Sequence, residues 1–62
     1  MKTPKIPAKG QLVRVSYDGA MCMGRVEDVL FAESDPAETE LFVRFADGDA
    51  AWVHFGDVKS AT

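Results

Sequence analysis

The sequence contains one cysteine and one histidine among its 62 residues, and it contains no long run of apolar residues. The single cysteine, Cys22, excludes a disulfide bond within the chain, and with His54 alone it cannot build a zinc site. We therefore expect a free thiol in a reducing compartment. No apolar segment approaches the ~20 residues that span a membrane, and the first residues show no signal-peptide pattern. These absences predict an intracellular protein, cytoplasmic or nuclear (nucleoid), with no membrane partner.

The residue patterns of common active sites are also missing. The sequence shows no nucleophile paired with a base, no pair of carboxylates in a plausible pocket and no glycine-rich loop of the kind that binds phosphate. A barrel built from 62 residues encloses little concave volume unless it assembles into oligomers, and we expect a monomer. We therefore predict a non-catalytic protein that needs no cofactor and no metal ion.

Positive charge is scarce outside the beginning of the chain. Residues 1–9 contain three lysines, two prolines and no acidic residue, and we predict a flexible basic arm there. Residues 10–62 contain four basic residues against ten acidic ones, which gives this part a formal charge of −6. A body of this kind repels the phosphates of nucleic acids and attracts basic proteins or peptides.

The remaining pattern is that of β-strands. Apolar and polar side chains alternate through residues 41–45 and again through residues 51–55, as they do in strands that bury one face. Asp47-Gly48 lies between the two runs. Asp-Gly in this position is the strongest short-range signal of a β-hairpin, because glycine adopts positive φ without strain. These residues therefore predict one hairpin.

Two strands are predicted before this hairpin. Residues 12–17 alternate in the same way and end at Asp18-Gly19, a second turn signal. Residues 21–31 predict a long second strand. Gly24 in its early part indicates a bulge or a close approach of neighbouring backbone, which a tightly bent sheet requires.

The rest of the chain predicts loops and one short strand. Residues 32–39 predict an acidic, solvated loop, and Gly56-Asp57 predicts a 3₁₀ turn before a last strand at residues 58–60. Five antiparallel strands of this length cannot form two separate sheets, so closure of residues 10–62 into one small barrel is predicted. The predicted core consists of inward-facing aliphatic residues with two phenylalanines at its margin: Val13, Val15, Val26, Leu41, Val43, Val53 and Val58, with Phe45 and Phe55.

Two segments have a characteristic order and spacing of residues. They read VRVSYDGxxxxGRV at residues 13–26 and VRFADGDxxWVxFxDV at residues 43–58. Together they resemble the Tudor family of SH3-like barrels and, more loosely, the Agenet and chromo-barrel domains. The resemblance spans residues 10–60 and implies an all-β, five-stranded antiparallel SH3-like (Tudor-like) barrel.

The resemblance also implies a ligand site. Tudor domains bind methylated lysine or arginine in an aromatic cage at the open end of the barrel, where a cation over a ring face gains ~0.5–2 kcal/mol. By position, Tyr17 and Phe45 match cage aromatics and Asp47 matches the acidic member of the cage. The sequence departs from the family in two places, with Met-Cys-Met instead of an aromatic before Gly24 and with Asp49 after the turn. The implied cage is therefore incomplete.

The two Asp-Gly turns should lie at the same end of the predicted barrel and bring the two rings together. With Asp18, Asp47 and Asp49, the rings would form an acidic notch with an aromatic floor. Trp52, at an outward position, is a further candidate anchor. We predict that this site binds a basic peptide or protein surface, methylated or not, in preference to a phosphate.

Two other functions fit parts of the sequence. A nucleic-acid-associated barrel that resembles the KOW domains of transcription and ribosomal proteins would use the lysine arm with Arg14, Arg25 and Arg44, against the charge of the acidic body. An enzyme is the remoter alternative. Plasmid-type dihydrofolate reductases build a pore from four small SH3-like barrels, but this chain has Trp-Val-His-Phe at residues 52–55 where they have Val-Gln-Ile-Tyr.

Overall fold

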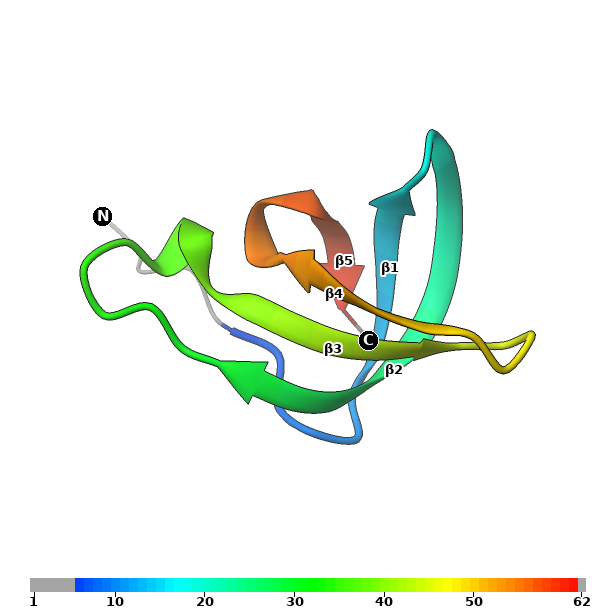
Figure 1. The fold of residues 1–62 in the computed structure, drawn as a ribbon, viewed down its shortest axis with the longest axis horizontal. Helices are drawn as coiled ribbons and strands as arrows, with labels where there is room; N and C mark the ends of the chain where they lie inside the picture. Colours follow the sequence, from blue (N-terminus) through cyan, green and yellow to red (C-terminus); the bar gives the residue numbers. More distant parts are fainter. Residues whose placement is uncertain (1–5, 62) are drawn as a thin grey trace.

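The computed structural model describes residues 6–61, which form one five-stranded antiparallel β-sheet (Figure 1). The predicted all-β, antiparallel fold is confirmed. None of the helical segments in this part of the chain is long and apolar enough to cross a membrane. The elements are β1 (Leu12–Tyr17), β2 (Ala20–Leu30), the 3₁₀ turn η1 (Pro36–Glu38), β3 (Glu40–Phe45), β4 (Ala50–His54), the 3₁₀ turn η2 (Phe55–Asp57) and β5 (Val58–Ala61).

The strands lie in the order β4-β3-β2-β1-β5, each hydrogen-bonded to its neighbours. The two edge strands, β4 and β5, are joined directly by η2. Figure 1 shows that β2 is long and bent, so that β1 pairs with its first half and β3 with its second half. Over residues 6–61 the hydrogen-bond ladder does not close on itself. Closure into a barrel therefore stays a prediction.

The buried side chains gather on the inner face of the curved sheet. Six of the seven predicted core residues are buried, and Val58 is half-buried and packs against them. Phe45 is 9% exposed at the margin of the core, and Phe55 is half-buried there. The core cluster consists of Val13, Val15, Val26, Leu41, Val43, Phe45 and Val53.

Gly24 lies where β2 passes from its pairing with β1 to its pairing with β3. A Cβ atom at this position would lie 2.5 Å from Val43 Cγ1 and 2.7 Å from the Arg44 carbonyl oxygen. The predicted close approach of neighbouring backbone is thus confirmed. The register shift in β2 occurs further along the strand, between Val26 and Asp28.

Both Asp-Gly turns adopt the positive φ angles that their composition predicts. Asp18 has φ 52° and Gly19 has φ 76°, the combination of a two-residue type I′ turn. Gly48 has φ 97° in a three-residue turn. There, the Gly48 N–H donates to the Phe45 carbonyl at 3.0 Å and the Phe45 N–H donates to the Asp49 carbonyl at 2.7 Å.

The loop at residues 32–39 is more than the solvated connector that its composition predicts, because Thr39 anchors it. This side chain is completely buried, and its hydroxyl accepts a hydrogen bond from the Ala32 N–H at 3.1 Å. The Thr39 N–H donates to the Pro36 carbonyl at 3.1 Å, and the Thr39 carbonyl accepts from the Phe55 N–H at 2.7 Å. One residue therefore ties the loop to η1 and η2.

The predicted flexible arm, residues 1–9, falls partly outside the described residues, which begin at Ile6. Ile6 packs against the core and Pro7 is buried. The Gly10 N–H donates to the Val26 carbonyl at 2.7 Å, which attaches the approach to β1 to the sheet. The flexibility of the arm as a whole stays a prediction.

Candidate functional site

Tyr17 and Phe45 meet on the inner face of the sheet, at the ends of β1 and β3. Their ring centroids are 5.3 Å apart and their planes are inclined by 32°. Tyr17 is 43% exposed, whereas Phe45 is 9% exposed. The structure thus brings together the two rings that the sequence singled out. Tyr17 offers a ring surface to solvent, and Phe45 supports it from the core.

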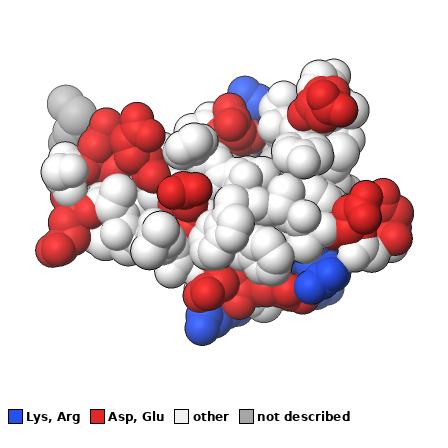
Figure 2. Space-filling view, viewed as in Figure 1, with Lys and Arg blue, Asp and Glu red and all other residues white. Residues whose placement is uncertain are grey.

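The three carboxylates of the predicted notch lie on the two turns that flank these rings. Asp18 belongs to the β1–β2 turn, and Asp47 and Asp49 belong to the β3–β4 turn, where Asp47 Oδ1 accepts a hydrogen bond from the Asp49 N–H at 3.0 Å. The two turns project in different directions in Figure 1, and Figure 2 shows acidic atoms at both tips with uncharged surface between them. The carboxylates flank the rings from two sides instead of converging on one point. We call the two rings and these three carboxylates the notch.

Trp52 is not part of the notch. It lies on the outer face of the sheet, where it pairs across β3 and β4 with Phe42. The ring centroids of this pair are 5.2 Å apart and the planes are inclined by 45°. Trp52 is 48% exposed, so it forms a second, separate aromatic surface. A binding role for Trp52 stays a prediction.

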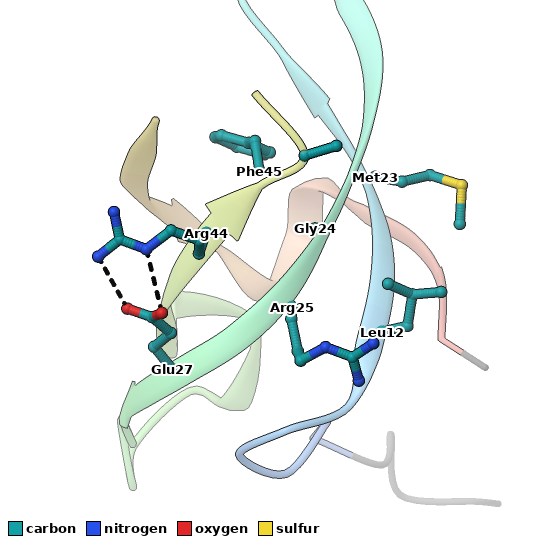
Figure 3. Close-up of a pocket in the computed structure, with 8 residues that line it drawn as sticks. Leu12, Met23, Gly24, Arg25, Glu27, Arg44 and Phe45 are labelled. Atoms are coloured by element: carbon teal, nitrogen blue, oxygen red, sulfur yellow. Dashed lines mark hydrogen bonds and ion pairs between the residues drawn. The ribbon is translucent and has the colours of Figure 1, made fainter. Parts of the chain in front are cut away.

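A hollow of about 390 Å³ lies beside the point where β2 and β3 diverge (Figure 3). The hollow is lined by Met23 and Gly24 of β2, by Phe45 at the end of β3 with the following Ala46, and by Leu12 of β1. Sequence reasoning did not identify this hollow. Gly24 signalled a close approach of strands, but where two strands part depends on their pairing and not on local pattern.

Two arginines on the rim of the hollow are held by partners within the protein. Arg44 forms a two-bonded ion pair with Glu27, with Nε–Oε2 at 3.0 Å and Nη2–Oε1 at 3.1 Å (Figure 3), and its Nη1 donates to the Gly48 carbonyl at 3.0 Å. The hydrogen bonds from Arg44, assisted by its charge, lower the pKa of the Glu27 carboxyl, and the same contacts raise the pKa of Arg44. Arg25 Nη1 donates to the Gly10 carbonyl at 2.7 Å.

In the part of the chain that the structure describes, no group of three or more histidine, cysteine or acidic side chains could hold a metal ion. Cys22 is a free, half-buried thiol, and His54 Nε2 lies 3.8 Å from a carboxylate oxygen of Glu38 at the surface.

No model of a protein family, no curated protein and no solved structure matches this chain. Nothing from known relatives therefore bears on the resemblance to Tudor domains. The function of the notch is inferred from its own geometry and charge.

Proposed function

We propose that this protein is a non-catalytic interaction module that binds a positively charged peptide segment at the notch. The observation that carries the proposal is the contact between Tyr17 and Phe45, in which Tyr17 stays 43% exposed beside acidic turns. A lysine or arginine side chain has an apolar stem and a cationic end. Packing of the stem on the ring and the interaction of the cation with the ring face both contribute favourable binding free energy. The carboxylates attract the positive charge.

The proposal includes the fold, an SH3-like barrel of the Tudor type. The strand order β4-β3-β2-β1-β5 supports it, together with the 3₁₀ turn η2 that leads from one edge strand directly into the other. The bend in β2 (Figure 1) also supports it, because a sheet of five strands must curve strongly before its edges approach each other.

The ion pairs favour a cationic ligand over nucleic acid. Of the three arginines that a nucleic-acid-binding face would use, Arg44 is neutralised by the two-bonded contact with Glu27, and Arg25 donates to a backbone carbonyl. A phosphate backbone would have to displace these partners and approach the acidic body. Nucleic acid is therefore the alternative outcome of the test and not part of the proposal.

The burial of Phe45 limits the affinity. Only the tyrosine of the notch presents a largely exposed ring, and the further aromatics of a complete cage are replaced by methionine and aspartate. A single ring with screened carboxylates gives weak binding, with a Kd on the order of 0.1–1 mM, or about 4–5.5 kcal/mol. We expect little discrimination between methylated and unmethylated lysine.

The test is an amide chemical-shift titration of the protein with short lysine-rich peptides, methylated and unmethylated, and with single- and double-stranded nucleic acid. Tyr17→Leu keeps an apolar side chain but removes the ring, and it should abolish the shifts. Trp52→Leu is the matched control, because it removes an equally exposed ring from the outer face, and it should leave binding unchanged.

Charge is tested in the same way. Asp47→Asn removes the charge while keeping an acceptor for the Asp49 N–H, and it should weaken peptide binding, whereas Asp57→Asn in η2 should not. If nucleic acid produces the shifts and Arg14→Ala removes them, the peptide proposal is wrong and the nucleic-acid alternative replaces it.

A further inference from the structure

Within residues 6–61, the first four residues of β2 have a strand neighbour on one side only. β2 pairs with β1 from Ala20 to Arg25, but its pairing with β3 begins only at Gly24. Residues 20–23 therefore form a free sheet edge within the fold, in addition to the outer edges of β4 and β5. This edge starts beside Tyr17, which pairs with Ala20, and ends at the hollow beside Met23.

Hairpin geometry determines which backbone groups point toward this free edge. A two-residue turn makes its flanking residues, here Tyr17 and Ala20, a hydrogen-bonded pair, and such pairs alternate along an antiparallel ladder. Cys22 therefore bonds to β1, while Met21 and Met23 direct their N–H and C=O groups away from β1. Two residues spaced by two that both direct backbone donors and acceptors away from β1 are a template for another strand.

The edge lacks the features that normally prevent strand addition. Protected edges carry charged side chains or proline, and residues 20–23 read Ala-Met-Cys-Met. The side chains of Met21 and Met23 are 56% and 43% exposed on the outer face. Methionine is flexible and adapts to many apolar partners, so these side chains can cover those of an added strand.

The hollow gives an added strand a place for a side chain. Met23 of β2 and Ala46, which follows β3, both line it. An added strand beside residues 20–23 would lie on the side of β2 where β3 pairs from Gly24 onward. Arg44 lines this space with its guanidinium group turned toward Glu27 (Figure 3). On the opposite face of the same edge lies the exposed ring of Tyr17. Successive side chains of a strand point to opposite faces, so neighbouring residues would reach the hollow and the ring.

We propose that residues 20–23 of β2 bind an extended, basic peptide as an additional β-strand, with an apolar side chain in the hollow and the adjacent lysine or arginine over Tyr17. The inference rests on the proposed function and adds to it the mode of binding and the alternating basic and apolar sequence of the ligand. Charge complementarity selects this occupant. The turns at both ends of the free edge carry Asp18 on one side and Asp47 and Asp49 on the other, and the edge itself carries no charge.

The experiment uses two capped peptides of equal charge, Lys-Val-Lys-Val-Lys and Lys-Gly-Lys-Gly-Lys. The first has the strand-forming, alternating pattern and the second does not. We expect the valine peptide to bind more tightly by about fivefold or more, and to slow amide hydrogen exchange at Met21 and Met23. Equal affinity of the two peptides, without added protection at these amides, would overturn the proposal.

Met21→Pro is the decisive variant. It removes the N–H that points away from β1 and leaves the β1–β2 ladder complete, and proline is tolerated at a free edge. Met21→Ala is its control, since it removes the side chain and keeps the N–H. We expect the valine peptide to lose about fivefold in affinity with proline relative to alanine. The same test can be made on the unsubstituted protein with a valine peptide whose backbone nitrogens facing β2 are methylated. This peptide should bind no better than the glycine peptide.

The outcomes separate this inference from the proposed function. If Tyr17→Leu abolishes binding while Met21→Pro and peptide N-methylation have no effect, the notch binds the cation but strand addition is wrong. If neither peptide binds, both are wrong. If Met21 and Met23 become protected from exchange at high protein concentration without peptide, the edge pairs with a second copy of this chain, and the proposed occupant is wrong.

Discussion

Adding one methyl group at Gly24 should remove much of the stability of this protein. In Gly24→Ala, the new Cβ would lie 2.5 Å from Val43 Cγ1 and 2.7 Å from the Arg44 carbonyl oxygen, with Phe45 Cδ1 at 3.1 Å. The valine can change its rotamer at a cost, but the carbonyl belongs to the backbone of β3. It can move only if β2 and β3 separate where their pairing begins. Relief of this clash therefore requires an unfavourable rotamer of Val43 or loss of strand pairing, and both cost stability.

The size of the stability loss in Gly24→Ala follows from two opposing effects. Overpacking of a core costs about 1–3 kcal/mol and occasionally more, and contact with backbone places this site at the upper end. Replacing glycine by alanine restricts the unfolded chain and returns only about 0.4–1 kcal/mol. We expect a net loss of about 2–3 kcal/mol. A chain of 62 residues has a free energy of unfolding of about 3–9 kcal/mol, so the loss is a large fraction of the total.

Urea denaturation followed by circular dichroism measures this loss of free energy. In thermal denaturation, the melting temperature should fall by about 8–24 °C. The matched control is Gly56→Ala. A Cβ at Gly56 would meet only the Ala37 carbonyl oxygen at 3.8 Å, an ordinary contact, and we expect a change within about 0.5 kcal/mol. If the two alanine variants lost the same stability, the close approach of β3 to Gly24 would not be what requires glycine there.

Two further predictions concern the ion pair and the anchored loop. Hydrogen bonds from Arg44 lower the pKa of Glu27 from 4.5 in the folded protein, so the pair stabilises the fold above that pH and loses this effect as the pH falls through the lowered pKa. The stability difference between the wild type and Glu27→Gln, measured by urea denaturation, should therefore shrink on acidification from pH 7, and a constant difference would contradict the linkage. Thr39→Val keeps the shape of the side chain but leaves the Ala32 N–H without its acceptor, at a cost of about 1–3 kcal/mol. Faster amide hydrogen exchange at Ala32 should accompany the loss. Thr39→Ser keeps the hydroxyl and should restore the protection of Ala32, whereas normal protection in Thr39→Val would show that the hydroxyl does not anchor the loop.

The strands and turns follow from short-range physics, which explains why they could be predicted. Alternation of side chains determines which residues of β1, β3 and β4 face inward, and the valines of these strands are buried as expected. The turn residues impose positive φ within four residues of chain, whatever lies elsewhere in the fold. Even the contact of Tyr17 with Phe45 could be anticipated, because both precede an Asp-Gly turn at the end of a strand.

Features that depend on distant pairing could not be predicted from the sequence. Thr39 lies in a polar, acidic segment, and nothing local distinguishes it from its exposed neighbours. Its burial depends on how η1 and η2 meet in space. The separation of the acidic turns, which places their carboxylates on two sides of the rings, likewise depends on how far β2 bends.

The sequence by itself determined the five strands, their antiparallel order along the chain, the two Asp-Gly turns and the inner face of the sheet. These depend on side-chain alternation and on the φ preferences of single residues. Only the tertiary structure decided where β2 changes partner, and with it the free edge at Met21 and Met23, the hollow where β2 and β3 diverge and the ion pair of Glu27 with Arg44. Strand register is selected by the packing of the whole core, because a shift of one residue would turn every buried side chain to solvent.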